Sequence, residues 1–262
     1  MHPGRDSAGF PILSPACRLV VIPARYQSSR LPGKPLEPIA GRPMIQHVYE
    51  RATRAKLVDA VVVATDDDRI RQAVERFGGR VWVTRTDHET GSDRVAEVVA
   101  GLDCDLVINV QGDEPLIEPT AIDQAIEPLL AEPALQMTTL CRRIDDPSLL
   151  ASRDVVKVVR DLRGNALYFS RAPIPFARRE GAGPLGWKHI GLYAYRRDFL
   201  LRFARLPAGP LERLESLEQL RALEHGLDIR VVETTYDSVG VDTPADLERV
   251  RRLAAALPQA EH

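Results

Sequence analysis

The sequence predicts an α/β fold built on a mostly parallel sheet with helices on both faces. Short apolar runs rich in β-branched residues recur in the first half of the chain, and segments with helical spacing lie between them. Strands that alternate with helices are typical of a parallel sheet, in which the carboxyl ends of the strands meet at one edge. We therefore expect the functional side chains at that edge.

The first half of the chain supplies these elements in order. Leu19–Ile22 is an apolar run that Pro23 ends, because proline cannot donate to the hydrogen-bond ladder of a sheet. The elements that follow are a helix at 43–56, a strand at 58–64, a helix at 69–77, a strand at 81–83, a helix from 91 to 100 and a strand at 106–110.

The second half is less regular. Leucines recur at helical spacing in 210–225, and Gly226 is a suitable stop for a helix there. A last helix follows Thr243, which can cap it, and Pro244 fits its first position. The predicted elements are strands at 137–143, 155–161, 166–169, 190–195 and 229–233, a loop rich in proline and glycine at 171–187, and helices at 210–225 and 244–256.

Length and composition are those of an ordinary globular protein. The chain has 262 residues, of which 44% are hydrophobic and 27% charged. We expect one domain at 18–262 with a smaller irregular lobe around 145–200. The preceding segment, 1–17, contains three prolines and two glycines and lacks the pattern of a signal peptide, so we expect a disordered extension.

Charge and cysteine content exclude several classes of function. A net charge of −2 gives no reason to expect nucleic acid or an anionic membrane as a partner. No run reaches the eighteen or so apolar residues of a membrane-spanning helix. The three cysteines, Cys17, Cys104 and Cys141, are far apart and lack CxxC spacing, which argues against disulfides and a zinc site. We expect a cytoplasmic protein.

A basic loop follows the first strand. Arg25, Arg30 and Lys34 lie within ten residues, and Gly33 with two flanking prolines restricts the path of the backbone. A solvated basic loop is one interpretation, and an anion site is the other. Burying such cations unpaired would cost several kcal/mol each. The sequence has neither the Walker loop nor GxGxxG, but arginine forks with a lysine suit a triphosphate.

Three acidic clusters are candidate metal sites. Asp66–Asp68 follows a strand, but these aspartates also suit the cap and first turn of the next helix, which is the interpretation that we favour. Asp113 lies in a turn after the strand at 106–110. Asp242 lies just outside the last helix. Two carboxylates, with water and phosphate completing the shell, are a usual arrangement for Mg²⁺ with a nucleotide.

Several long strings resemble one enzyme family. PARYQSSRLPGKPL at 23–36, NVQGDEP at 109–115 and GVDTPADLERV at 240–250 are similar to signatures of the 3-deoxy-manno-octulosonate cytidylyltransferases. The resemblance runs from about Leu19 to Leu253. It implies a Rossmann-like nucleotidyltransferase sheet and a homodimer formed through the irregular lobe. It also implies transfer of CMP from CTP to the anomeric hydroxyl of 3-deoxy-D-manno-octulosonate (Kdo), with release of pyrophosphate, for lipopolysaccharide biosynthesis.

The resemblance also assigns roles to residues. It makes Arg25, Lys34 and Asp113 catalytic and makes Asp113 and Asp242 the ligands of Mg²⁺. It places Arg30, Arg85 and Ser92 on the nucleotide, and it lines the sugar pocket with Gln111, Arg171, His189, Tyr193, Glu218 and Gln219. Five of these substrate residues have a plainer interpretation: Ser92 as a helix cap, Arg171 at the surface, His189 buried for structure, and Glu218 and Gln219 solvated on a helix.

Two other functions fit parts of the sequence. A glycosyltransferase would bind its metal at Asp66–Asp68, and a nucleotide-binding regulatory module would hold phosphates without turnover. Paired metal carboxylates argue against the second, because a sensor can hold phosphates with cations alone. Kdo and its amino analogue both fit the sequence, and no residue stands out as a general base.

Overall fold

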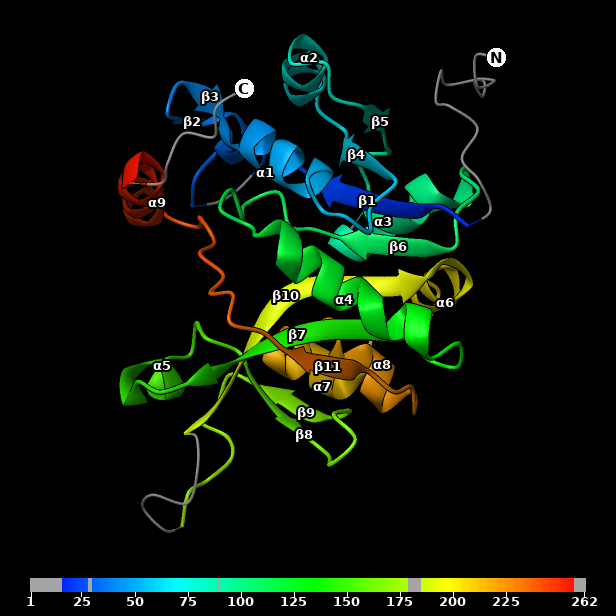
Figure 1. Cartoon of the computed structure of the whole chain (residues 1–262), viewed down its shortest axis with the longest axis vertical. Helices are drawn as coiled ribbons and strands as arrows, with labels where there is room; N and C mark the ends of the chain where they lie inside the picture. Colours follow the sequence, from blue (N-terminus) through cyan, green and yellow to red (C-terminus); the bar gives the residue numbers. More distant parts are fainter. Residues whose placement is uncertain (1–15, 28–29, 89, 179–184, 257–262) are drawn as a thin grey trace. The chain divides into compact units, whose positions relative to one another are not determined.

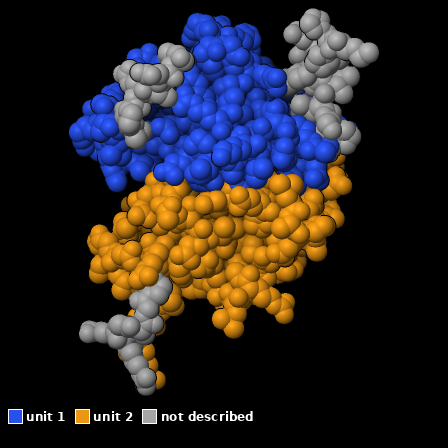
Figure 2. Space-filling view, in the orientation of Figure 1, with its two compact units in different colours: residues 1–123, 238–262 blue, residues 124–237 orange. Residues whose placement is uncertain are grey.

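The computed structural model describes residues 16–27, 30–88, 90–178 and 185–256 (Figure 1). The chain forms two compact units, coloured blue and orange in Figure 2. Unit 1 comprises residues 1–123 and 238–262, and unit 2 comprises residues 124–237. Of the expected extension at 1–17, residues 1–15 lie outside the described part, and Cys17 is buried next to the first strand.

Unit 1 contains four parallel strands in the order β6–β1–β4–β5. Val20 in the centre of β1 pairs with Val61 on one side and Ile108 on the other. Every residue of β4 and β6 is buried, which explains why these strands are continuous apolar runs. Their bounds are β1 (Arg18–Pro23), β4 (Ala60–Thr65), β5 (Val81–Val83) and β6 (Leu106–Asn109).

Helices cover both faces of these strands, as predicted. In Figure 1, α1 crosses in front of the strands and α3 lies behind them. A two-stranded hairpin and α9 close a small core around Ile39, Met44 and Val250. The elements are η1 (Lys34–Leu36), β2 (Pro38–Ile39), β3 (Arg42–Pro43), α1 (Met44–Thr53), α2 (Asp68–Arg76), α3 (Gly91–Ala100), α4 (Pro119–Ala131), which crosses into unit 2, and α9 (Pro244–Ala256).

Unit 2 holds a mixed sheet. β7 pairs parallel with β11 and antiparallel with β10, while β8 pairs antiparallel with both β10 and β9. The strands are β7 (Met137–Ile144), β8 (Lys157–Arg160), β9 (Ala166–Ser170), β10 (Gly186–Arg196) and β11 (Arg230–Glu233). The helices are α5 (Pro147–Ala151), α6 (Arg197–Phe203), α7 (Pro210–Glu215) and α8 (Leu220–Glu224).

The prediction of one helix at 210–225 is wrong. Helix α7 ends at Ser216, which has the left-handed backbone angle φ of 54°, and α8 begins four residues later. The leucine stripe is therefore divided. Leu214 is 81% exposed, whereas Leu217 and Leu220 are buried.

Some elements were not predicted. Helices α4, α5 and α6 and the β2–β3 hairpin had no assignment, and β10 begins at Gly186, inside the segment expected to be a loop. The described part contains no helix with the length and apolar character that crossing a bilayer requires.

Candidate active site

The basic loop after β1 folds back on itself at Gly33. The backbone N–H of Gly33 donates to the carbonyl of Tyr26 at 2.8 Å. Gly33 has a φ of 73°, and a Cβ there would come within 3.2 Å of the Tyr26 ring. Both features favour glycine. The fold-back ends in η1, whose first residue is Lys34, so the lysine is held close to the end of β1.

A second turn, after β6, presents Asp113. A Cβ on Gly112 would meet the carbonyl oxygen of Pro23 at 2.8 Å, so only glycine lets this turn approach the end of β1. The backbone N–H of Val241 donates to the carbonyl of Asp113 at 2.9 Å. This bond brings the following residue, Asp242, to the same place. Asp242 lies in the segment between β11, which ends at Glu233, and α9.

Asp242 lies just before a helix with its own cap. Thr243 and Asp246 exchange hydrogen bonds in the capping arrangement, as the sequence predicted. The cap therefore uses Thr243 and leaves the carboxylate of Asp242 to other partners.

The two carboxylates share the ammonium of Lys34. Its Nζ lies 2.6 Å from Oδ2 of Asp113 and 3.2 Å from Oδ1 of Asp242. The other oxygen of Asp242 lies 3.1 Å from the guanidinium of Arg30. Burial alone would lower the pKa of Lys34, but the charges and hydrogen bonds of Asp113 and Asp242 raise it above its usual value. The lysine is therefore charged at neutral pH.

A cavity of about 350 Å³ opens beside this cluster. Arg25 lines it, and one nitrogen of its guanidinium, Nη2, is buried without a hydrogen-bond partner among the described residues. A buried cationic donor in a cavity is suited to an anion, because leaving it unpaired is costly. The lining residues are Pro23, Ala24, Arg25, Gln27, Arg30, Lys34, Pro35, Gly91, Gln111, Gly112 and Asp113.

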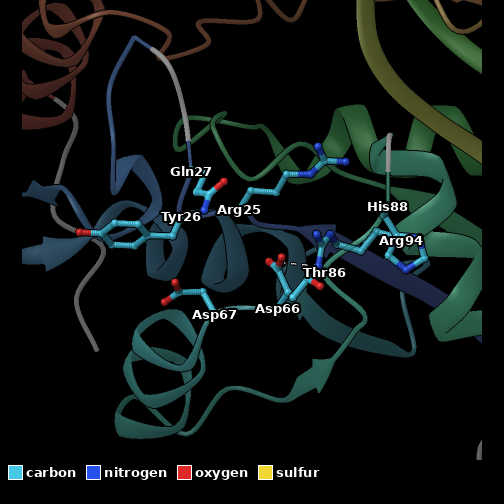
Figure 3. Close-up of a pocket in the computed structure, with 8 residues that line it drawn as sticks. All are labelled: Arg25, Tyr26, Gln27, Asp66, Asp67, Thr86, His88 and Arg94. Atoms are coloured by element: carbon cyan, nitrogen blue, oxygen red, sulfur yellow. Dashed lines mark ion pairs between the residues drawn. The ribbon is translucent and has the colours of Figure 1, made fainter.

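A second cavity, of about 290 Å³, shares Arg25 and Gln27 with the first (Figure 3). Arg94 on α3 is 1% exposed, and its guanidinium lies 3.3 Å from Asp66. Its Nε has no partner among the described residues. In Figure 3 the side chains of Asp66, Thr86 and Arg94 converge. The lining residues are Arg25, Tyr26, Gln27, Asp66, Asp67, Thr86, His88 and Arg94.

The interpretation of the Asp66–Asp68 cluster as helix cap and first turn is confirmed for Asp67 and Asp68 but not for Asp66. Asp67 caps α2 by accepting from the N–H of Arg69 at 2.9 Å, and Asp68 is the first residue of that helix. Asp66 pairs with Arg94.

The two residues assigned to the nucleotide from the loop at 84–92 line neither of these two cavities. Arg85 is exposed, pairs with Asp87 at 3.1 Å and lines neither cavity. Ser92 is buried in the first turn of α3 and is not its cap, since Thr90 has that role together with Asp93. The same loop instead contributes Thr86 and His88 to the second cavity.

Arg94 is a candidate residue that the sequence analysis missed. It lies four positions before Val98, so both side chains share the buried face of α3. An arginine on such an apolar face is unusual, because buried cations require partners. Its position on this apolar face is the signal by which the sequence could have revealed Arg94 as a candidate.

Asp113 and Asp242 fit a divalent metal. Both are hard oxygen donors, and both already reach one cation, so their oxygens converge. Among the described residues, no group of three or more His, Cys, Asp or Glu side chains could hold a metal. The remaining ligands would therefore come from water and from phosphate oxygens.

In unit 2, His189 and Tyr193 on β10 lie together. Their ring centroids are 5.5 Å apart, whereas four residues of a regular strand span roughly 13 Å. A register shift between Ile190 and Tyr193 accompanies this close approach. Gly191 lies between them, and a Cβ there would meet nothing within 4 Å. The space above Gly191 is thus open.

His189 is neutral, and its tautomer can be inferred. Burial lowers the pKa of His189 to about 3. The Thr139 hydroxyl lies within 3.0 Å of the carbonyls of Ile190 and Leu192 and of Nε2 of His189. Its single hydrogen points to a carbonyl, so it accepts from Nε2–H of the imidazole, and Nδ1 remains an acceptor. Burial first, then the charges of Tyr195 and Glu218, raise the pKa of Tyr193, which keeps its proton.

Arg171, Glu218 and Gln219 belong to one region of unit 2. Arg171 follows β9, and its Nε donates to the carbonyl of Glu215 at 3.0 Å, so it is not a free surface arginine. Glu218 and Gln219 lie in the turn between α7 and α8 rather than on a helix, which corrects our expectation. Gln219 is 5% exposed, and its Nε2 has no partner among the described residues.

Comparisons with known proteins identify the family of this chain. The family model described as cytidylyltransferase matches residues 19–229. A 3-deoxy-manno-octulosonate cytidylyltransferase from Geobacter sulfurreducens is 58% identical, over 88% of this chain and 96% of its own. One from Solibacter usitatus is 57% identical, over 91% and 94%.

Solved structures give the same result. A CMP:2-keto-3-deoxy-manno-octonic acid synthetase complexed with CTP superposes with a TM-score of 0.88 at 50% identity, covering 92% of this chain and 99% of its own. A cytidylyltransferase from Leptospira borgpetersenii, with a TM-score of 0.65 and 17% identity, shows the fold alone. The protein therefore belongs to the 3-deoxy-manno-octulosonate cytidylyltransferase family.

Proposed function

We propose that the protein transfers CMP from CTP to the anomeric hydroxyl of Kdo, releasing pyrophosphate and forming CMP-Kdo for lipopolysaccharide biosynthesis. Relatives more than half identical carry the name of this activity, and a solved relative at 50% identity was complexed with CTP. The observation that carries the proposal is the buried, unpartnered guanidinium nitrogen of Arg25 in a cavity that Arg30 and Lys34 also line. A triphosphate supplies the anion that this cavity lacks.

The reaction requires alignment and neutralisation of charge more than covalent chemistry from the protein. Arg25 and Arg30 would bind the β- and γ-phosphates, and Lys34 would stabilise the pyrophosphate as it leaves. Asp113 and Asp242 would hold Mg²⁺, which when bound would polarise the α-phosphoryl group. Gln111 lines the same cavity and would face the attacking sugar.

The second cavity is suited to the nucleoside of CTP. It joins the phosphate cavity through Arg25 and Gln27, and a base and ribose are continuous with the phosphates. The Asp66 carboxylate accepts hydrogen bonds and the Arg94 guanidinium donates them, so the pair can address both the amino group and the carbonyl of cytosine. Arg85 and Ser92 have no place in this proposal, because neither lines the cavity.

The sugar side of the reaction is proposed to use residues of unit 2. Nδ1 of neutral His189 offers an acceptor, and the protonated hydroxyl of Tyr193 offers a donor. The buried Nε2 of Gln219 offers another donor, with Glu218 beside it. Arg171 is proposed to meet the sugar carboxylate. We further propose a cytoplasmic homodimer that forms through the lobe around 145–200.

Pyrophosphate release with CTP, Kdo and Mg²⁺, against controls that lack each, tests the reaction. Release that requires all three establishes it, and UTP in place of CTP is the matched control for the base. Release of pyrophosphate with 8-amino-Kdo but not with Kdo would change only the assignment of the sugar substrate. Binding of CTP without any product would favour a regulatory module, and no binding of CTP would contradict the assignment of the basic loop.

A glycosyltransferase is separated from this proposal by two variants. Replacing Asp68 by alanine should leave turnover largely intact, because Asp68 lies on the surface of α2 and lines neither cavity. Replacing Arg25 should abolish turnover. The reverse result would favour the glycosyltransferase.

A further inference from the structure

We propose that Lys34 is the resident cation of the metal site, and that its ammonium must leave Asp113 and Asp242 before a divalent metal can bind them. The nucleotide-free protein then has low affinity for metal, and the triphosphate opens the site by offering Lys34 another partner. This inference rests on the proposed function, since it takes Asp113 and Asp242 as the metal ligands.

The geometry of the cluster is the first support. A single nitrogen, Nζ of Lys34, lies within hydrogen-bond distance of both carboxylates, at 2.6 and 3.2 Å. These are the two groups that would hold the metal, and they converge on the ammonium. A cation between them and a metal between them are therefore alternatives for the same oxygens.

The lysine is also held in place by its backbone. Its N–H donates to the carbonyl of Leu31, and the residue opens the short helix η1 after the fold-back at Gly33. The side chain is only 13% exposed, against 60% for the neighbouring Arg30. Lys34 is thus the enclosed partner of the carboxylates, and Arg30 is the solvated one.

Electrostatics explains why a cation is needed there before the metal arrives. Two carboxylates that converge on one point repel each other, and removing the ammonium of Lys34 would leave only the exposed Arg30, on Asp242, to compensate their charges among the described residues. The ammonium supplies this compensation through two charge-assisted hydrogen bonds. A metal that binds without nucleotide must break both, and this lowers its apparent affinity.

The triphosphate changes the balance, because Lys34 lines the phosphate cavity as well. Phosphate oxygens there can take over the ammonium, and the carboxylates become available to the metal. The binding of metal and of triphosphate is then positively coupled, and the coupling is the same in both directions. Lys34 competes with the metal for the two carboxylates, and the triphosphate draws Lys34 away from them.

The test is Mn²⁺ affinity of the nucleotide-free protein, measured by calorimetry at constant ionic strength. We expect Lys34→Met to bind Mn²⁺ about 10- to 100-fold more tightly than the wild type, the range that losing hydrogen bonds between charged groups implies. Lys34→Arg, which keeps the charge, should remain as weak as the wild type. Lys56→Met is the matched control, since it removes the same charge from an exposed position away from the site and should change nothing.

The outcomes separate this inference from the proposed function. Asp113→Asn added to Lys34→Met should abolish the gain. An unchanged or lower affinity in Lys34→Met, with Mn²⁺ binding still dependent on Asp113, would overturn the inference and leave the metal site standing. Mn²⁺ binding that is independent of Asp113 would instead overturn the metal site itself. If Lys34→Met fails to fold, Lys34→Gln is the second variant for the same measurement.

Discussion

At the scale of single residues, the site depends on glycines as much as on charges. Gly33 and Gly112 let two turns approach β1, and each would be obstructed by a single Cβ. The cations and carboxylates could be selected from the sequence by residue type. Their meeting could not, because it depends on a backbone hydrogen bond from Val241, the neighbour of Asp242, to the carbonyl of Asp113, a position far away in the chain.

Asp113→Asn tests the metal assignment in the full reaction. The amide removes the negative charge that would hold the metal, so we expect kcat to fall roughly 1000-fold, or about 4 kcal/mol of transition-state stabilisation. Pyrophosphate release at saturating CTP and Kdo measures this. The unfolding free energy should be checked in parallel, because Lys34 also loses part of its pairing. Turnover within a few-fold of the wild type would refute the role of Asp113.

His189 predicts a specific dependence of stability on pH. Its folded pKa of about 3 lies below the usual value of 6.5, so the unfolded chain binds the proton more readily. The stabilisation is complete above pH 6.5 and is lost as the pH falls toward 3, at up to about 1.4 kcal/mol per pH unit. Between pH 7 and 5, the unfolding free energy measured with denaturant should therefore change less steeply with pH for His189→Gln than for the wild type. Equal slopes would mean that the imidazole is not shielded from protons.

At the scale of elements, the sequence predicted unit 1 better than unit 2. Strands β4 and β6 of unit 1 are fully buried, so their apolar runs are unambiguous, and caps such as Asp67 and Thr243 mark helix starts. Helix α4 was missed because it follows the turn that carries Asp113 and contains Pro128, although its buried residues have helical spacing. The prediction of one helix at 210–225 failed because Ser216, whose backbone is left-handed, divides the segment. A serine in the sequence gives no signal for that conformation.

A buried ion pair joins the two halves of that divided segment. Arg221 on α8 donates to Glu212 on α7 through two hydrogen bonds of 2.8 and 2.6 Å, with both side chains at most 10% exposed. At the other end, Glu224 accepts from the backbone N–H groups of Leu211 and Glu212. The turn that carries Glu218 and Gln219 is thereby fixed between two short helices that could not be stable alone.

Arg221→Met should reduce the free energy of unfolding by about 3–5 kcal/mol, because it leaves the Glu212 carboxylate buried without its partner. The double variant Glu212→Met/Arg221→Met should recover most of this loss. The exposed pair Arg71–Glu75 is the control and should couple only weakly, because solvent screens it. In the stable double variant, KM for Kdo should rise while KM for CTP is unchanged. A single variant as stable as the wild type would show that the pair is solvated.

At the scale of the whole molecule, the long family strings carried more information than periodicity did. They located most of the candidate residues, because each string spans a turn whose glycine and charges serve the same site. They did not single out Arg94. They assigned Arg85 to the nucleotide, whereas its exposed side chain pairs with Asp87 in a loop that ends in the hydrogen-bonded cap of Thr90 on α3. Side-chain direction in loops is set by such local hydrogen bonds rather than by residue type.

The three cysteines allow opening of the whole chain to be followed. Each is buried and unbridged. Burial raises the pKa of Cys17 to about 11 and that of Cys141 to about 12, so their reactive thiolates are scarce at pH 8. We expect a thiol reagent to label the native protein only when it opens, and to label all three at once in denaturant.

CTP with Mg²⁺ should slow this labelling, because both are proposed to bind residues of unit 1. At a concentration 100 times the dissociation constant, Cys17 and Cys104 in unit 1 should be labelled about 100-fold more slowly, as mass action requires for a ligand that binds only the folded form. Rates read by mass spectrometry of digested protein give each thiol separately. Unchanged rates at Cys17 and Cys104 would contradict nucleotide binding to unit 1. Cys141 belongs to unit 2, so equal slowing there would mean that the chain opens in one cooperative step, whereas an unchanged rate would mean that unit 2 opens independently.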